Sequence, residues 1–76
     1  MQAYILTRVE GGKERVIREQ MQKSPAVKEM SFVHGEYDLV LKIETQDLES
    51  LDKFLFDELR QANGIKETTT LIVAYV

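Results

Sequence analysis

Two segments of strand–helix–strand character follow one another along this 76-residue chain. In each segment an extended run is followed by a helical pattern and then by a second extended run. The loop after each helix leads into a similar tripeptide, Val-Lys-Glu at residues 27–29 and Ile-Lys-Glu at residues 65–67, which indicates an internal duplication. The order therefore predicts an α+β fold of the ferredoxin-like βαββαβ type, a four-stranded antiparallel sheet with both helices on one face.

The two helices are predicted from apolar residues at helical spacing. The first covers residues 13–23 and ends before Pro25, because a residue that precedes proline avoids the helical conformation. The second begins at Asp47, whose side chain can cap a helix, and closes at Asn63–Gly64 in a left-handed C-cap. Each helix has one apolar stripe, formed in the first by Val16, Ile17, Gln20 and Met21 and in the second by Leu48, Leu51, Leu55, Leu59 and Ala62 with Phe54 alongside.

The middle of the chain predicts a hairpin. Two strand-like runs, residues 27–34 and 37–45, meet at Gly35, which can adopt the positive φ of a two-residue type II′ turn. Such a turn leaves Tyr37 and Asp38 just inside the second strand. A carboxylate there can receive an ammonium group and the adjacent backbone amides can receive a carboxylate, as an amino acid ligand requires. The alternative is local, because turns recruit Gly and Asp for their backbone preferences alone.

The second face of the sheet is predicted to be apolar. Two helices cover only one face, and the other face of an ordinary antiparallel sheet is polar. In the last strand both alternating sets are apolar, Thr70, Ile72, Ala74 and Val76 on one face and Leu71, Val73 and Tyr75 on the other. The first strand shows the same pattern. A monomer rarely tolerates an exposed apolar patch, and a domain this small without cysteines needs another source of stability, so we expect self-association through the sheet.

The charge pattern excludes some classes of partner. The net charge is −3, and the ten basic side chains are interspersed with thirteen acidic ones. Phosphate-binding surfaces need clustered Lys and Arg, so direct binding to nucleic acid is not expected. No apolar run approaches the roughly 20 residues that a membrane span needs, and no signal-peptide pattern opens the chain, so no membrane contact is expected. The absence of cysteine fits a reducing cytoplasm.

No catalytic motif stands out. His34 is the single histidine and has no nucleophile beside it in sequence, so we interpret it as a surface side chain or a subunit contact. Gly11–Gly12 lacks the spacing of a phosphate-binding loop and reads as a strand-to-helix turn. The carboxylates do not fall at metal-ligand spacings. We therefore expect no catalytic residue, no metal site and no cofactor.

Two runs of the chain carry a family resemblance. The sequence Val-His-Gly-Glu-Tyr-Asp-Leu-Val at residues 33–40, with Thr-Thr-Thr-Leu-Ile-Val at residues 68–73, resembles the effector domain of the Lrp/AsnC family of regulators, often called RAM for regulation of amino acid metabolism. The resemblance extends over essentially the whole chain, so residues 1–76 are expected to form a single RAM-like domain for ligand binding and oligomerisation. Because the chain begins in the first strand of that domain, it resembles the stand-alone members that lack the helix-turn-helix.

The resemblance implies an amino acid effector bound at the interface between dimers. Asp38 would bind the α-ammonium, the amides around Gly35 the α-carboxylate, and Thr69 and Thr70 the remaining polar atoms, with Tyr37 at the mouth of the site. The threonines and the hairpin tip need not touch within one chain, and a site between subunits would bring them together. The resemblance also implies dimers, higher rings of dimers such as an octamer, and full-length Lrp/AsnC regulators as further partners.

We therefore interpret the chain as a cytoplasmic, non-enzymatic effector domain of Lrp/AsnC type, in which amino acid binding is coupled to assembly and thereby to transcription regulation. Asp38→Ala is expected to abolish binding and to leave the fold intact. Two alternatives stay open. One is a small dimeric ferredoxin-like enzyme of the monooxygenase type, which would have its ligand in an intramolecular pocket. The other is a purely structural assembly module that binds no amino acid.

Overall fold

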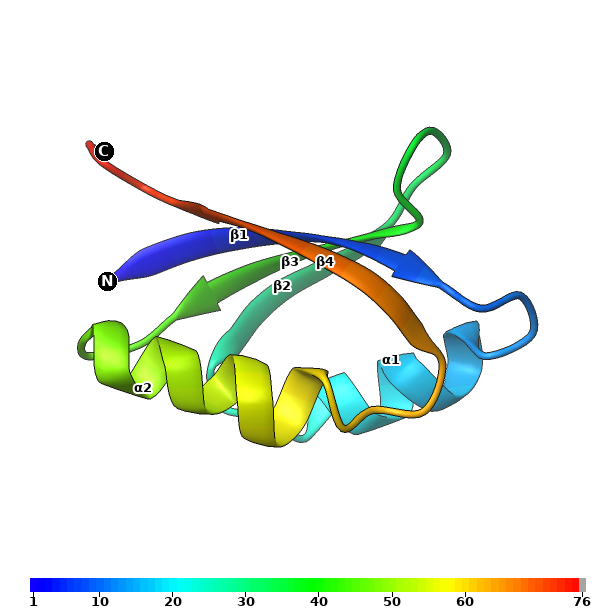
Figure 1. Ribbon diagram of the computed structural model, residues 1–76, viewed down its shortest axis with the longest axis horizontal. Helices are drawn as coiled ribbons and strands as arrows, with labels where there is room; N and C mark the ends of the chain where they lie inside the picture. The colour runs from blue at the N-terminus through cyan, green and yellow to red at the C-terminus, as the bar shows by residue number, and fades with distance from the viewer. Residues whose placement is uncertain (76) are drawn as a thin grey trace.

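The computed structural model describes residues 1–75 and has the predicted order of elements (Figure 1). The elements are β1 (Gln2–Val9), α1 (Glu14–Gln22), β2 (Val27–Phe32), β3 (Leu39–Glu44), α2 (Leu48–Lys53), the π-helical turn η1 (Phe54–Leu59) and β4 (Ile65–Ile72). The strands pair antiparallel in the order β2-β3-β1-β4. The helices lie together on one face of the sheet (Figure 1), so the ferredoxin-like α+β fold is confirmed.

The hydrophobic core lies between the sheet and the helices. Strand alternation in β1 separates Ala3, Ile5 and Val9, which are buried, from Tyr4, which is exposed. The other fully buried large side chains of the core are Leu39, Leu41 and Ile43 from β3 and Ile17, Met21, Leu51, Phe54 and Leu59 from the helices. Burial of an apolar side chain of this size contributes roughly 1.5–3 kcal/mol. The core is therefore built from one face of the sheet and one stripe of each helix.

The buried stripes are narrower than predicted. Val16 and Leu48 were expected in them and are 43% and 49% exposed, and Gln20 is exposed as well. In α1 the buried positions are Ile17 and Met21, one turn apart, and Val16 lies about 100° around the helix from Ile17, on the side away from Met21. Leu48 is the first residue of α2, one turn before the first buried position. Val76, which was expected on a face of the last strand, lies outside the described residues.

The predicted two-residue turn after β2 is wrong. The connection is a six-residue loop, residues 33–38, and Tyr37 and Asp38 precede β3 instead of lying inside it. Gly35 has the expected positive φ, +143°. The loop opens because the backbone N–H of Asp38 donates to the carbonyl of Thr7 at 2.9 Å, so Asp38 is bonded to β1.

One of the two predicted ends of the second helix is confirmed. The backbone N–H of Ser50 donates to Oδ1 of Asp47 at 2.8 Å, so Asp47 is the N-cap. The predicted C-cap is wrong, because η1 ends at Leu59 and Arg60 is its C-cap. The last turn is wide: the N–H of Arg60 donates to the carbonyl of Leu55, five residues back, at 3.0 Å. Gly64, with a φ of +106°, instead turns the chain into β4.

Gly64 also lies in close contact with the start of α1. A Cβ at this position would be 2.5 Å from Cβ of Lys13 and 3.2 Å from Cδ1 of Ile17. Its carbonyl accepts a hydrogen bond of 2.8 Å from the backbone N–H of Glu10. The connection between η1 and β4 therefore packs against the β1–α1 turn, and only glycine fits there.

We expect Gly64→Ala to lower the free energy of unfolding by about 1–3 kcal/mol, because the methyl group displaces Lys13 and the left-handed backbone is strained. Urea unfolding at one fixed protein concentration measures the change. Gly11→Ala is the matched control, since a Cβ there has no atom within 4 Å. Equal stability of the two variants would show that the contact of Gly64 with α1 does not constrain the fold.

The N-cap predicts a pH-dependent contribution to stability. The Ser50 backbone N–H donates to the Asp47 carboxylate and, with the Ser50 side chain, lowers the pKa of Asp47 below its ordinary value of 3.8. The charged form therefore stabilises the folded state above pH 3.8, and this contribution disappears as the pH falls through the lowered pKa.

We accordingly expect Asp47→Ala to lower the Tm at pH 7 and the difference from the parent chain to shrink below pH 3.8. Asp47→Asn keeps an acceptor that does not titrate, so its Tm should stay above that of Asp47→Ala at both pH values. Thermal unfolding followed by circular dichroism at pH 7 and pH 3 tests this. A constant difference between Asp47→Ala and the parent chain would contradict it.

Candidate ligand-binding site

The β2–β3 loop, residues 33–38, rises from the sheet on the side opposite the helices (Figure 1). The backbone N–H of Val33 closes its base by donating to the carbonyl of Asp38 at 2.9 Å. His34, Gly35 and Glu36 form the exposed tip. A Cβ on Gly35 would meet no atom within 4 Å, so glycine is required there by the positive φ of the backbone and not by lack of space.

Asp38 anchors this loop to β1. Its carboxylate oxygen Oδ2 accepts a hydrogen bond of 2.8 Å from the backbone N–H of Val9. The regular pairing of β1 with β3 ends at Thr7 and Leu39. Backbone groups two residues apart in a strand point to the same side, so the N–H of Val9 extends past the start of β3, where a side chain from the loop accepts its hydrogen bond. One of the two carboxylate oxygens of Asp38 is therefore engaged within the chain.

The loop also meets β4 across the uncovered face of the sheet. The hydroxyl of Tyr37 lies 3.1 Å from Oγ1 of Thr69, within hydrogen-bond distance. The guanidinium of Arg8 lies 6.0 Å from the centre of the Tyr37 ring and pairs with Glu67 at 3.2 Å, between Nε and Oε2. These four residues, Arg8, Tyr37, Glu67 and Thr69, are called the Tyr37 cluster below. The hairpin loop and the threonine strand thus meet within one chain, without a second subunit.

Thr70 lies on the other face of the sheet. It is paired opposite Ile5, whereas Thr69 is opposite Leu6. Side chains of directly opposed residues in an antiparallel pair lie on the same face, and Ile5 is fully buried under the helices. The structure therefore brings Tyr37, Asp38 and Thr69 together near one end of the sheet and separates Thr70 from them.

Sequence reasoning missed Arg8 and Glu67. Both lie on the uncovered face, directly opposite each other in the pairing of β1 with β4. The signal was present, because strand alternation places Arg8 on the same face as Leu6 and Glu67 on the same face as Thr69. The ion pair is solvent-accessible, and its main effect here is to hold Arg8 beside Tyr37.

The uncovered face carries a diagonal row of apolar side chains beside the Tyr37 cluster. This row, called the apolar diagonal below, consists of Tyr4, Leu6, Val40 and Leu71. Tyr4 and Leu71 are directly opposite each other and are 39% and 50% exposed. Leu6 follows Tyr4 on the same face and is opposite Val40. Lys42 and polar residues flank these four side chains, so the predicted apolar character of this face is present as a diagonal patch.

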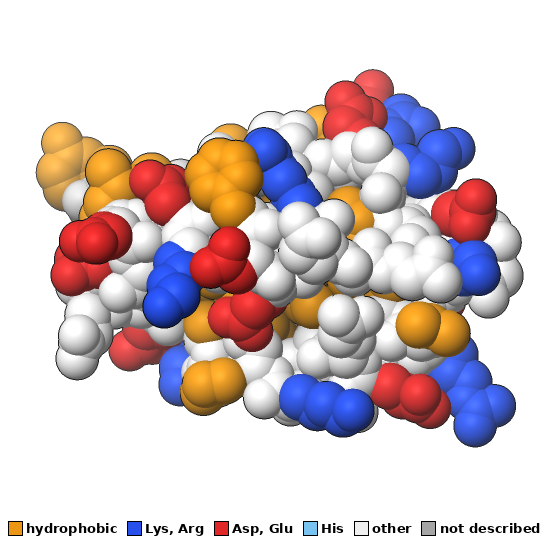
Figure 2. Space-filling view, turned by 60° about the horizontal axis from the view of Figure 1, so that its bottom comes forward, with side chains coloured by type: hydrophobic (Ala, Val, Ile, Leu, Met, Phe, Trp, Pro, Cys, Tyr) orange, Lys and Arg blue, Asp and Glu red, His pale blue; other side chains and the backbone are white. Residues whose placement is uncertain are grey.

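Metal-ligand clusters and membrane-spanning helices are both absent from residues 1–75. No group of three or more His, Cys, Asp or Glu side chains in this range could hold a metal ion. None of the helices in this range has the length and apolar character needed to cross a membrane. Figure 2, which brings the helical side of the molecule forward, shows acidic and basic side chains interspersed over the surface.

Comparison with known proteins points to one family. The family model of the Lrp/AsnC ligand binding domain matches residues 2–75. The HTH-type transcriptional regulator FL11 of Pyrococcus horikoshii is 37% identical over 73 residues, which cover 96% of this chain and 48% of that regulator. The chain therefore spans about half the length of the curated relatives that it matches.

Solved structures agree with this assignment. FFRP-DM1 is 42% identical with a TM-score of 0.90, over 95% of this chain and 96% of that chain. AsnC of E. coli has a TM-score of 0.91 at 20% identity, over 99% of this chain and 51% of its own. The regulator NMB0573 of Neisseria meningitidis, solved as a complex with L-Met, has a TM-score of 0.83 at 24% identity, over 97% and 49%. The last two show likeness of fold alone.

The anchoring role of Asp38 revises the expectation that Asp38→Ala leaves the fold intact. We expect this variant to lower the free energy of unfolding by about 1–3 kcal/mol, because the N–H of Val9 loses its acceptor. Glu36→Ala, an exposed carboxylate in the same loop, is the control and should change stability by less than about 0.5 kcal/mol. Urea unfolding of both variants tests this, and equal stability would show that the bond to Val9 is dispensable.

Proposed function

The chain belongs to the family of Lrp/AsnC ligand binding domains, and on that premise we propose that it is an amino-acid-binding effector module whose ligand binds between subunits and favours their assembly. The main support is the Tyr37 cluster, in which side chains from the loop, β1 and β4 converge on the uncovered face. The choice of an amino acid is supported by NMB0573, which has the same fold and was solved with L-Met.

The loop provides the groups that an amino acid requires. The amides around Gly35, at an exposed tip, take the α-carboxylate. Asp38 takes the α-ammonium through the carboxylate oxygen that does not bind Val9. The hydroxyls of Tyr37 and Thr69, which are bonded to each other in the free chain, also form hydrogen bonds with the ligand. Thr70 faces away within one chain, so it contributes only from a neighbouring subunit.

The apolar diagonal of the uncovered face supports assembly into dimers. Tyr4 and Leu71 remain exposed in a molecule whose whole accessible surface is 5181 Å². Stable interfaces bury about 1,200–2,000 Å² in total, and the sheet is the broad face that the helices leave free. Two copies packed sheet to sheet form the dimer, and dimers associate further into a ring such as an octamer.

A ligand that contacts two subunits is a switch for assembly. It binds the assembled state more tightly than the separated chains, and by linkage it favours assembly by the same free energy. Because the curated relatives are HTH-type transcriptional regulators, the module acts in the cytoplasm on transcription, by mixing into oligomers of full-length regulators of its family. It needs no catalytic residue and no direct contact with nucleic acid for this role.

Light scattering on a sizing column, with and without a pool of the twenty amino acids, tests the proposal. We expect an oligomer without ligand, and a higher mass or a higher Tm with the pool; subdividing the pool then identifies the effector. Thr69→Val removes one partner of Tyr37 and should weaken binding of that amino acid by about tenfold. Ser31→Ala removes a hydroxyl from the exposed β2 edge and is the control.

Other results would point to other functions. An oligomer that releases no heat in calorimetric titration with any amino acid, and whose Tm none of them changes, would indicate a structural assembly module. A monomer at all concentrations contradicts the role of the apolar diagonal. An amino acid bound within a single chain, with turnover of a substrate there, indicates an enzyme of the same fold.

A further inference from the structure

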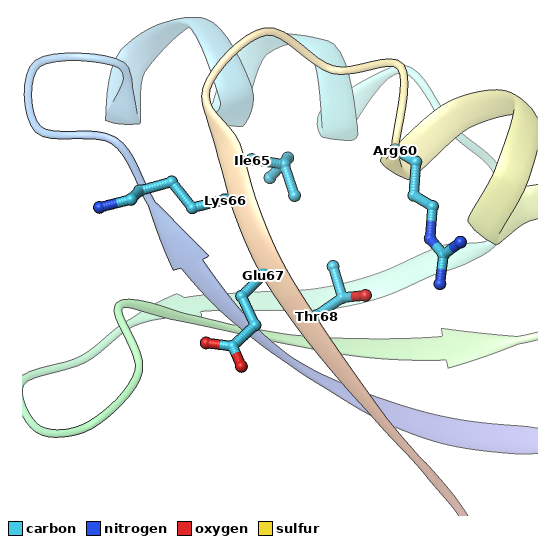
Figure 3. A pocket seen from close by; sticks show the side chains of 5 residues that line it. All are labelled: Arg60, Ile65, Lys66, Glu67 and Thr68. Atoms are coloured by element: carbon cyan, nitrogen blue, oxygen red, sulfur yellow. The ribbon is translucent and has the colours of Figure 1, made fainter.

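A hollow of about 260 Å³ lies at the free edge of β4, beside the end of η1 (Figure 3). Its lining is formed by Arg60, Ile65, Lys66, Glu67 and Thr68. Thr68 is paired opposite Thr7, which is fully buried under the helices, so Thr68 faces the helical side. The strand itself therefore separates Thr68 from the contact between Tyr37 and Thr69, and this hollow is distinct from the proposed amino acid site.

Arg60 is held in place at one wall of the hollow. Its guanidinium carbon lies 4.7 Å from the centre of the Phe56 ring, one helical turn earlier. Figure 3 shows the side chain extended along the edge of β4, on the side to which the Thr68 hydroxyl points. The ion pairs within residues 1–75 are Arg8 with Glu67 and Arg15 with Glu19, so this guanidinium has no carboxylate partner in that range. The planar guanidinium can donate two parallel N–H bonds, which suits a carboxylate.

The charge of the lining favours an anion with a single charge. Arg60 and Lys66 are positive, and Glu67 is negative and already paired with Arg8 at 3.2 Å. One carboxylate balances the net positive charge, whereas a doubly charged phosphate would meet the repulsion of Glu67. An edge strand also presents backbone N–H groups that no neighbouring strand uses. Ile65 adds an apolar wall for a short hydrocarbon chain.

The core-facing side of the sheet carries two neighbouring hydroxyl groups at this point. The other buried β1 positions are Ala3, Ile5 and Val9, whereas Thr7 places a hydroxyl there, opposite that of Thr68. Within residues 1–75 the Thr7 hydroxyl is buried without a hydrogen-bond partner. Thr68 in the lining, with Thr7 beside it on the adjacent strand, makes the sheet polar at this end of the hollow.

We propose that this hollow binds a small aliphatic monocarboxylate, whose carboxylate pairs with the Arg60 guanidinium and accepts a hydrogen bond from the Thr68 hydroxyl. The short hydrocarbon part lies against Ile65. Lys66 raises the local concentration of the anion without fixing its orientation. Glu67 lines the hollow and also belongs to the Tyr37 cluster, but the two groups that bind the carboxylate, on Arg60 and Thr68, do not, so this site can be tested separately from the amino acid site.

Sodium propionate, titrated into the full chain labelled with ¹⁵N, tests the proposal. We expect saturable NMR shifts of the Arg60 Nε–H and of the backbone N–H of Thr68. Propionamide, which has the same size without the charge, should give no saturable shift, and inorganic phosphate should bind at least several-fold more weakly. No saturable shift with propionate, or equal shifts with propionamide, would overturn the proposal.

Variants locate the binding on the guanidinium. Arg60→Gln should weaken propionate binding at least tenfold. Arg60→Lys should recover only part of the affinity, because lysine keeps the charge but lacks the planar group that donates two parallel hydrogen bonds. Arg15→Gln, on an exposed arginine of α1, is the matched control and should leave binding unchanged. Thr69→Val should also leave it unchanged, which separates this site from the amino acid site. Unaltered binding in a folded Arg60→Gln chain, judged by its Tm, would refute the assignment.

Discussion

The burial of a single face of the sheet is the constraint on which the rest of this structure depends. A chain of 76 residues has room for two helices, and both pack on the same side of four strands. The core is therefore made of inward strand positions such as Ile5 and Leu41 and of narrow helical stripes. The other face keeps apolar side chains such as Tyr4 and Leu71 exposed, and it is the face from which the β2–β3 loop rises.

The anchoring of Asp38 to β1 determines where the candidate site lies. The pairing of β1 with β3 ends at Thr7 and Leu39, and beyond it the backbone N–H of Val9 donates to the Asp38 carboxylate. That bond, with the one from the Asp38 N–H to Thr7, holds the loop over the end of the sheet. Tyr37 then reaches Thr69 on β4. Two hydrogen bonds from one loop residue to β1 thus place its neighbour, Tyr37, beside a strand on the far side of β1.

Much of the fold was predictable because its signals are local. Strand alternation and helical spacing depend on neighbouring residues, so the element order and most core positions followed from the sequence. The Asp47 cap involves a residue three positions away and was also predictable. The β2–β3 turn was not, because Asp38 bonds to Val9, 29 positions away, which no local turn rule contains. The predicted C-cap at Asn63–Gly64 was wrong for a similar reason. Gly64 is required by its contact with Lys13, which is distant in sequence, and not by the end of the helix.

The sequence alone therefore determined the fold class, the apolar character of both faces of the sheet and the residue types present at the candidate site, because periodicity and composition specify which side chains favour removal from water. Tertiary structure alone decided which of those residues meet. It joined Tyr37 to Thr69, placed Thr70 on the opposite face, and set Arg60 beside Thr68 at a free strand edge. These juxtapositions depend on strand register, on the hydrogen bonds of Asp38 to β1 and on a widened helical turn. A shift of one residue in strand register moves a side chain to the other face.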